Sequence, residues 1–381
     1  MRRIVAVVAV VALSFSVALP AAAGGRQQGC RPCSELVPDQ PLPACPVEPA
    51  QPATASASPL ADPDRAIRAL VLEGGGVKGV AYTGSLDVLS KVGRYDGIER
   101  VAGTSAGSLV ALLVALGYPP DEIRRIVFNI DFRQFRDGSK LGKFDRLIED
   151  FGLYRGEFAL CLLQCLVSDK LGMPDATFAD LEAKIAAGDD GFRRLYVVGT
   201  DLNNSSSTVF SYENEQTRDV PLALAARISM SFPVFFEAVR LDVDGNEDVW
   251  VDGGVLRNYP IRVFDSTEGP NPDVLGLHLG TAPARVAIPD FDKYVKQLFD
   301  TLLSAQVDSF CRTPADVERS VFIDPLGIST LDFNLTTKQK CDLMASGRDA
   351  MEKYLEEGGT QTCPGRLQPV LDDDEAYPLD G

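Results

Sequence analysis

The apolar and polar positions of this chain form a repeating pattern from Ala66 onward. Apolar runs of strand length are separated by stretches with helical periodicity such as VAYTGSLDVLSKV and SAGSLVALLVALGY. The strand-like runs are AIRALVLEG, IERVAGT, RRLYVVGTDL and DVLGLHLG. Strands that alternate with helices form mostly parallel sheets covered by helices. The pattern therefore predicts an α/β fold with a mostly parallel central sheet.

The rest of the chain is organised around this core pattern. A long insertion, roughly residues 119–187, has amphipathic helical stretches such as DEIRRIVFNI. We expect one folded domain over residues 66–290. Residues 291–381 predict a mostly helical region that ends in the acidic, solvated tail LDDDEAYPLDG.

The N-terminus has the pattern of a secretory signal peptide over residues 1–23. Two arginines precede an apolar run, and small residues precede the cleavage position. A membrane anchor is the alternative, but Ser14 and Ser16 interrupt the run and Pro20 ends it. Residues 24–65 are rich in Pro and Ala and predict a linker or tethered tail that contains cysteines. We expect export to an extracellular or periplasmic compartment.

Composition narrows the possible partners. The chain has 381 residues, 45% of them hydrophobic, which is enough for a large core. Its net charge of −17 argues against nucleic acid and against electrostatic attachment to anionic membranes. Contact with a membrane surface would be transient, apolar and local.

The eight cysteines predict disulfides, because an even number follows the signal peptide. Cys30, Cys33 and Cys45 would tie down the N-terminal tail; half of a zinc site is the alternative for them. Cys161 and Cys165 would share one face of a helix, or each would pair with a C-terminal cysteine. The remaining cysteines are Cys311, Cys341 and Cys363.

A first candidate site lies in EGGGVKG, residues 73–79, where a strand leads into a helix. Its glycines are Gly74, Gly75, Gly76 and Gly79. They leave backbone N–H groups bare at a helix N-terminus, which favours negative charge. The charge could be a pyrophosphate, because the spacing fits a dinucleotide fingerprint with Glu99 as its acidic residue, or the oxyanion of acyl transfer. Lys78 would neutralise a nearby anion or be a surface charge.

Two more candidate sites follow predicted strands. Ser105 lies between Gly103 and Gly107, in the strand-to-helix context of a nucleophile elbow. Asp252 ends the short strand VWVD and precedes two glycines. The carboxyl ends of neighbouring strands meet at one edge of an open α/β sheet, where ligands bind.

An acyl hydrolase accounts for all three sites, whereas a dinucleotide-binding oxidoreductase accounts only for the first. In the hydrolase reading Ser105 attacks an ester, and the N–H groups of the glycine loop hold the oxyanion. Asp252 accepts or orients the serine proton. Partial burial would have to raise the pKa of this carboxylate for it to act as a base.

These motifs resemble those of the patatin-like phospholipases. The residues that carry the resemblance are EGGGVKG (73–79), GTSAG (103–107), DGG (252–254), GLYRGEF (152–158), TFADLEAK (177–184) and ARISMSFPVFFEAV (226–239). The similarity extends over roughly residues 66–285. Arg257 departs from the family, which often has a second asparagine there.

The resemblance implies a three-layer α/β/α fold and a catalytic domain over residues 66–290. It implies a lipid acyl hydrolase with a Ser105–Asp252 dyad and an oxyanion hole at residues 74–79. The substrate would be a phospholipid or related acyl-ester lipid, and no metal or other cofactor would be needed.

Two alternatives to the dyad stay open. Ser105, Asp252 and the single histidine, His278, follow the chain order of an α/β-hydrolase triad. His278 lies between two leucines in a predicted strand, however, which favours a structural role. A non-catalytic lipid-binding protein on the same fold is the other alternative.

Several further side chains have both a functional and a structural interpretation. Phe232, Phe235 and Phe236 would line an acyl pocket or belong to the core. Asp201 would support the site or form an Asx turn at its strand end. The segment DVDGNED (242–248) lacks the ligand spacing of a calcium loop and predicts a hairpin turn.

Overall fold

The structure is a computed structural model, and it describes residues 30–43, 45, 66–139, 142–280, 286–357 and 363. By their internal contacts, the described residues from Pro32 onward form one compact unit. The predicted signal peptide, most of the predicted linker and the acidic tail lie outside the described residues.

A central sheet organises the fold. Its strands are β1 (Ala69–Leu72), β2 (Arg100–Thr104), β4 (Arg194–Asp201), β5 (Ser206–Phe210), β7 (Val239–Asp242), β8 (Glu247–Asp252), β9 (Val274–His278) and β10 (Ser320–Phe322). The order is β10-β9-β1-β2-β4-β8-β7, with β5 paired to β4. The pairs from β10 to β4 are parallel, while β5, β8 and β7 pair antiparallel. The predicted mostly parallel sheet is confirmed.

Alternation along the strands gives the sheet two apolar faces. In β1, Leu70 and Leu72 belong to one buried cluster, whereas Ala69 and Val71 belong to another. Successive side chains of a strand point to opposite faces, so a strand that is apolar throughout requires cover on both sides.

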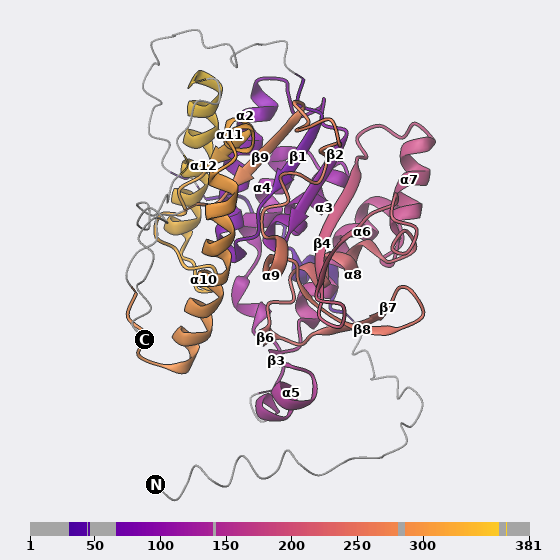
Figure 1. The fold of residues 1–381 in the computed structure, drawn as a ribbon, viewed down its shortest axis with the longest axis vertical. Helices are drawn as coiled ribbons and strands as arrows, with labels where there is room; N and C mark the ends of the chain where they lie inside the picture. Colours follow the sequence, from indigo (N-terminus) through magenta and orange to yellow (C-terminus); the bar gives the residue numbers. More distant parts are fainter. Residues whose placement is uncertain are drawn as a thin grey trace, which may run out of the picture. The chain divides into compact units, whose positions relative to one another are not determined.

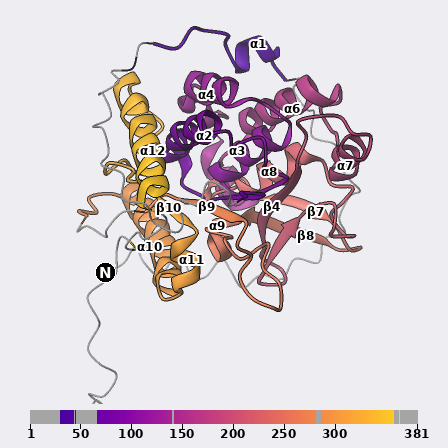
Figure 2. The same cartoon turned by 90° about the horizontal axis from the view of Figure 1, so that it is seen from above.

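Helices provide this cover on both faces. They are α1 (Cys33–Leu36), α2 (Tyr82–Lys91), α3 (Ala106–Ala115), α4 (Pro120–Asn129), α5 (Lys143–Glu149), α6 (Glu157–Leu171), α7 (Phe178–Ala186), α8 (Leu222–Ser229), α9 (Gly254–Arg257), α10 (Phe291–Cys311), α11 (Pro314–Glu318) and α12 (Thr337–Glu357). Figure 1 shows the helices around the sheet, and Figure 2 shows α2, α3, α4 and α6 on one face with α9, α10 and α11 on the other.

The elements expected from the apolar pattern are present. The runs that predict strands form β1, β2, β4 and β9, and the hairpin turn expected at 242–248 joins β7 to β8. The pattern did not reveal β5, β10 or a separate pair of short strands, β3 (Gly152–Tyr154) and β6 (Val234–Phe236). β3, β6 and β10 have only three residues each, too few for a clear period, and β5, with the sequence SSTVF, is polar over most of its length.

The C-terminal region packs onto the sheet domain. α12 lies along α2 and along the 3₁₀ helix η1 (Gly76–Ala81), which follows β1. The Ser85 hydroxyl on α2 donates a hydrogen bond to the Gly347 carbonyl on α12 at 2.7 Å. α12 therefore packs against the 3₁₀ helix that follows the glycine-rich loop.

Disulfides join distant parts of the chain. Cys33 pairs with Cys165, Cys45 with Cys341 and Cys311 with Cys363, and no cysteine among the described residues is free. Residues 33–45 are thus tied to the body of the protein, as expected. Cys161 and Cys165 lie on one helix, α6, as expected, but Cys165 pairs with Cys33 and not with a C-terminal cysteine, because α1 packs directly on α6.

Among the described helices, none combines the length and the apolar composition needed to cross a bilayer.

Candidate active site

Ser105 lies on a sharp turn between β2 and α3. Its backbone has φ 52° and ψ −124°, a region that non-glycine residues rarely adopt. A Cβ on Gly103 would overlap the Gly107 carbonyl oxygen, so the turn requires glycine there. The Ser105 N–H donates to the Ser229 hydroxyl at 2.8 Å, which holds the turn against α8. The serine is therefore presented in the geometry of a nucleophile elbow.

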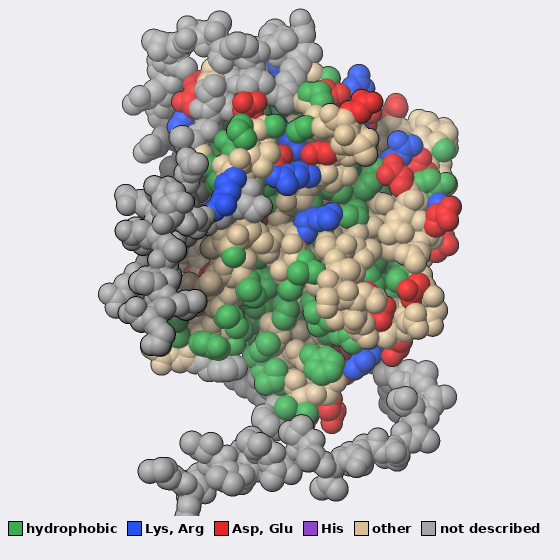
Figure 3. Space-filling view, in the orientation of Figure 1, with side chains coloured by type: hydrophobic (Ala, Val, Ile, Leu, Met, Phe, Trp, Pro, Cys, Tyr) green, Lys and Arg blue, Asp and Glu red, His purple; other side chains and the backbone are tan. Residues whose placement is uncertain are grey.

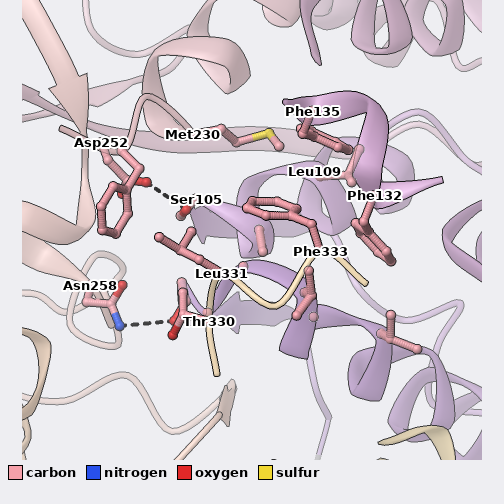
Figure 4. A pocket seen from close by; sticks show the side chains of 18 of the residues that line it. Ser105, Leu109, Phe132, Phe135, Met230, Asp252, Asn258, Thr330, Leu331 and Phe333 are labelled. Atoms are coloured by element: carbon pink, nitrogen blue, oxygen red, sulfur yellow. Dashed lines mark hydrogen bonds between the residues drawn. The ribbon is translucent and has the colours of Figure 1, made fainter. Parts of the chain in front are cut away.

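Asp252 meets Ser105 at the end of β8. The Ser105 Oγ donates a hydrogen bond to Asp252 Oδ2 at 2.7 Å, drawn as a dashed line in Figure 4. The other carboxylate oxygen, Oδ1, accepts from the Gly254 N–H at 2.7 Å. The Asp252 side chain is only 1% exposed. A buried carboxylate with two fixed donors is thus aimed at the serine hydroxyl.

Burial alters the acidity of Asp252. Loss of water raises the pKa of this carboxyl to about 7, although hydrogen bonds from Ser105 and Gly254 and the charge of Arg227 oppose the shift. Arg227 is itself buried, donates to the carbonyls of Gly156 and Arg155, and has its pKa lowered to about 10 by burial. The carboxyl can therefore take up and release a proton near neutral pH.

The glycine-rich loop lies beside the serine, between β1 and η1. A Cβ on Gly74 would come within 3.1 Å of the Ser105 Cβ, so the loop backbone approaches the serine as only glycine allows. The predicted loop residues Gly74, Gly75, Gly76 and Gly79 all line the cavity next to Ser105. Lys78 does not line this cavity; its charge instead acts on His278.

Asn258 and Glu73 hold the loop in position. The Asn258 amide donates to Glu73 Oε1 at 2.9 Å and to the Gly74 carbonyl at 3.1 Å. The Asn258 carbonyl accepts from the Gly74 N–H, and the other Glu73 oxygen accepts from the Leu279 N–H. The backbone after β8 is thereby joined to the backbones after β1 and β9.

The cavity in front of Ser105 is narrow and mostly apolar. Its volume is about 60 Å³, small beside the roughly 300–1,000 Å³ of pockets that hold drug-sized ligands. We call Gly74, Gly75, Gly76, Ser105 and Asp252 its floor. We call the residues contributed by α10 and the segment after β10 its cover: Phe299, Leu303, Thr330, Leu331 and Phe333. Figure 4 shows Leu331 and Phe333 close to Ser105.

Aromatic and apolar side chains from several elements complete the wall. Phe232 and Phe236 line the cavity, whereas Phe235 does not, and all three belong to the buried core. The other wall side chains are Val77, Val80, Leu109, Val110, Val127, Phe132, Phe135 and Met230. The Phe232 ring packs against Phe299 of the cover, with centroids 3.9 Å apart. Such a surface fits a hydrocarbon chain.

His278 lies away from the serine. It is 1% exposed, stacks on Phe310 and has Tyr259 at its edge. Neither ring nitrogen has a hydrogen-bond partner among the described residues, and the nearest carboxylate is Glu73 at 3.6 Å. Burial lowers the pKa of this imidazole. The geometry gives no support to the alternative triad.

Asp201 and Arg257 have structural roles near the site. Asp201 accepts hydrogen bonds from the backbones of Asn203 and Asn204, which is the Asx turn. The Arg257 carbonyl accepts from the Thr104 hydroxyl, so the residue that departs from the family still joins α9 to the elbow. The described residues contain no cluster of His, Cys, Asp and Glu that could hold a metal ion.

Sequence reasoning missed several side chains that shape the site. Ser229 and Arg227 lie within the motif ARISMSFPVFFEAV, but the motif alone does not indicate the role of either residue. Asn258 follows the DGG motif, but its role depends on Glu73, far away in the sequence. Phe299 and Leu303 lie beyond the recognised motifs and have no local signal.

Known proteins share this sequence pattern and fold. The patatin-like phospholipase family matches residues 70–265. The uncharacterized protein YqhO of Bacillus subtilis is 31% identical over 75% of this chain and 97% of its own length. A probable lipid hydrolase, 463L of Invertebrate iridescent virus 6, is 27% identical over 51% of this chain and 62% of its own.

A solved structure agrees in fold. VipD from Legionella pneumophila superposes with a TM-score of 0.53 at 17% identity, over 76% of this chain and 67% of that protein. The fold and the site define an α/β protein that carries a serine on a nucleophile elbow beside a mostly parallel sheet. The chain belongs to the patatin-like phospholipase family.

Proposed function

We propose that this protein is a lipid acyl hydrolase that cleaves fatty acyl esters through a Ser105–Asp252 dyad. The observation that carries the proposal is the 2.7 Å hydrogen bond from Ser105 Oγ to Asp252 Oδ2 at the floor of an apolar cavity. Family membership supports lipid esters as the substrate class.

The first half-reaction forms an acyl-enzyme. Ser105 Oγ attacks the ester carbonyl carbon while its proton passes to Asp252 Oδ2. The tetrahedral intermediate then collapses, and the alcohol of the lipid leaves with the proton from Asp252. The acyl group is now bonded to Ser105 Oγ.

The second half-reaction releases the fatty acid. A water molecule gives a proton to Asp252 as it attacks the acyl carbon, and the proton then returns to Ser105 Oγ. The carboxyl pKa of about 7 suits both directions of transfer. A pKa near 4 would make the carboxylate too weak a base.

The glycine loop would stabilise the oxyanion. The N–H groups of Gly75 and Gly76 have no acceptor among the described residues, and both glycines line the cavity beside Ser105. The Gly74 N–H is already used by the Asn258 carbonyl. We therefore assign the N–H groups of Gly75 and Gly76 as oxyanion donors. Gly74 instead lets the loop backbone approach Ser105 closely.

The test is fatty-acid release from phospholipid vesicles together with hydrolysis of a soluble short-chain ester. Ser105→Ala and Asp252→Asn should each lower kcat on the order of 10³-fold or more. Asp201→Asn is the matched control, because Asp201 is also buried at a strand end but serves only its own turn.

His278→Ala separates the dyad from the triad. A folded His278→Ala protein that retains wild-type rates supports the dyad, and one as inactive as Ser105→Ala would mean that the histidine is the base. Wild-type protein that releases no acid from any ester would instead favour the non-catalytic lipid-binding alternative.

A further inference from the structure

Helix α10 has two apolar faces with different surroundings. Phe299 and Leu303 point inward and belong to the cover of the Ser105 cavity. Tyr294, Leu298 and Leu302 follow one another at intervals of four residues, which places them on one side of the helix. Their exposed fractions are 51%, 50% and 47%. We call these three residues the outer stripe.

The outer stripe continues into neighbouring exposed apolar side chains. Val286 and Ile288 precede the helix, and Leu256 lies on α9, which packs against α10. Figure 3 shows hydrophobic side chains gathered over the lower part of α10 and over α9, β6 and β3, with most charged side chains above this area and at its margins. An apolar patch of this kind marks an interaction surface.

The position of the stripe identifies the partner. Only the thickness of α10 separates the outer stripe from Phe299 and Leu303, so the patch borders the cavity that would take an acyl chain. A lipid surface is the partner that can supply both apolar contact and substrate there. The six exposed apolar side chains of the patch are also few beside the roughly 20–30 residues that each partner contributes to a stable dimer interface.

Charge narrows the kind of lipid surface. The chain has a net charge of −17, which disfavours approach to an anionic bilayer. Apolar side chains on one helix face can instead enter the boundary between headgroups and acyl chains of a neutral bilayer. We propose that the outer stripe of α10 docks the protein on the surface of zwitterionic lipid. The choice of lipid as partner rests on the proposed function, whereas the binding experiment below does not require the protein to be active.

Vesicle binding tests the docking surface directly. The probe is phosphatidylcholine vesicles in a flotation assay, with the Ser105→Ala protein so that no lipid is consumed. Adding Leu298→Glu and Leu302→Glu should weaken binding about tenfold or more, because each change replaces buried apolar contact by a charge. Binding unchanged by these substitutions would overturn the proposal.

A matched control comes from elsewhere on the surface. Val92 and Met173 are 49% and 48% exposed, nearly the same as the two leucines, and lie on neither α10 nor the cavity wall. Val92→Glu with Met173→Glu should leave vesicle binding within about twofold of the parent. An equal loss in this control would mean that added negative charge alone weakens binding and would overturn the assignment to α10.

Soluble substrate separates this proposal from the proposed function. In the active protein, which keeps Ser105, the double change Leu298→Glu with Leu302→Glu should leave the rate of short-chain ester hydrolysis at the wild-type level. The rate of hydrolysis of vesicle lipid should fall about tenfold. If the wild-type protein hydrolyses no ester, the hydrolase proposal is wrong, but the flotation assay still tests whether the outer stripe binds lipid.

Two further outcomes would overturn the proposal that the outer stripe docks on zwitterionic lipid. A wild-type dimer that the leucine substitutions convert to monomer, with no vesicle binding by either, would assign the outer stripe to a second copy of the chain. Binding that requires anionic lipid and disappears in high salt would assign docking to basic residues instead.

Discussion

The floor of the Ser105 cavity lies at the carboxyl edge of the sheet, whereas its cover comes from the C-terminal part of the chain. Floor residues lie at the end of β8 or just beyond the ends of β1 and β2, so backbone pairing fixes their positions. The cover depends mainly on side-chain packing, such as Phe299 on Phe232. A few hydrogen bonds join its elements to the segments that carry the floor, among them the one from the Val77 N–H to the Thr330 carbonyl and the one from Gln306 on α10 to the Gly254 carbonyl.

This difference separates two kinds of sensitivity. A change in the floor should alter the chemistry on every ester. A change in the cover or its supports should alter stability or lipid binding and leave the chemistry on a small soluble ester intact. Three predictions test this separation, from the largest expected change in free energy to the smallest.

The first prediction concerns the support of the C-terminal region. The Cys45–Cys341 disulfide joins residues 296 apart and anchors α12, which packs against the 3₁₀ helix that follows the glycine loop. Cys45→Ala with Cys341→Ala should lower the free energy of unfolding by about 3 kcal/mol, because the cross-link restricts the unfolded chain. Chemical denaturation measures this loss.

Ester hydrolysis well below the melting temperature is the companion measurement. The kcat for a soluble ester should stay within about twofold of wild type, because the floor does not depend on the cross-link for its backbone pairing. A large fall in kcat while the protein remains folded would show that α12 positions the glycine loop, and the separation of floor from support would fail.

The second prediction concerns the floor. Gly103→Ala should lower the free energy of unfolding by about 2 kcal/mol, because the added Cβ meets the backbone of Gly107 and Ser108 rather than a movable side chain. The same shift displaces Ser105, so kcat should fall as well. Thermal melts and ester assays on one preparation measure both effects.

Gly97→Ala is the matched control. A Cβ there meets only the Ile67 and Arg94 carbonyl oxygens, at 3.6 and 3.8 Å, which are ordinary contacts. Stability should change by less than about 0.5 kcal/mol, with unchanged kcat. Equal effects of the two substitutions would contradict the tight elbow.

The sequence predicts the floor better than the cover. The floor depends on turns and strand ends, whereas the cover depends on packing between distant segments. Glycines next to Ser105, and Asp252 at a strand end, are local signals because the turn chemistry and the strand period act within a few residues. Parallel pairing of β1 with β2 brings the glycine loop and Ser105 to one edge, whereas Asp252 reaches this edge on β8, which pairs antiparallel to β4. The sequence therefore predicted the sheet, the elbow turn and the approach of Asp252 to the serine.

The residues it missed depend on partners far away in the chain. Asn258 becomes part of the site only through Glu73 and Gly74, and Ser229 only through the Ser105 backbone. The same is true of Cys165, whose partner depends on the packing of α1 against α6. Such contacts leave no period or motif of their own in the sequence.

The third prediction concerns the proton acceptor in the floor. The carboxyl of Asp252 has its pKa raised to about 7, so it is mostly protonated below pH 7 and cannot accept the serine proton. The kcat/KM for a soluble ester should therefore rise with pH and level off above about pH 8, with the value at pH 6 about tenfold below the plateau. Initial rates between pH 5 and 9 measure the profile.

Protein stability has the opposite pH dependence, which allows the two effects to be separated. Because the folded pKa of Asp252 lies above the ordinary aspartate value of 3.8, the folded state retains a proton that the unfolded chain releases, and this contribution to stability is lost as pH rises from about 4 through 7. A low rate at pH 6 thus cannot arise from this group unfolding the protein. An inflection near pH 4 would mean that Asp252 is hydrated rather than buried. An inflection that disappears in His278→Gln would transfer the role of base to the histidine.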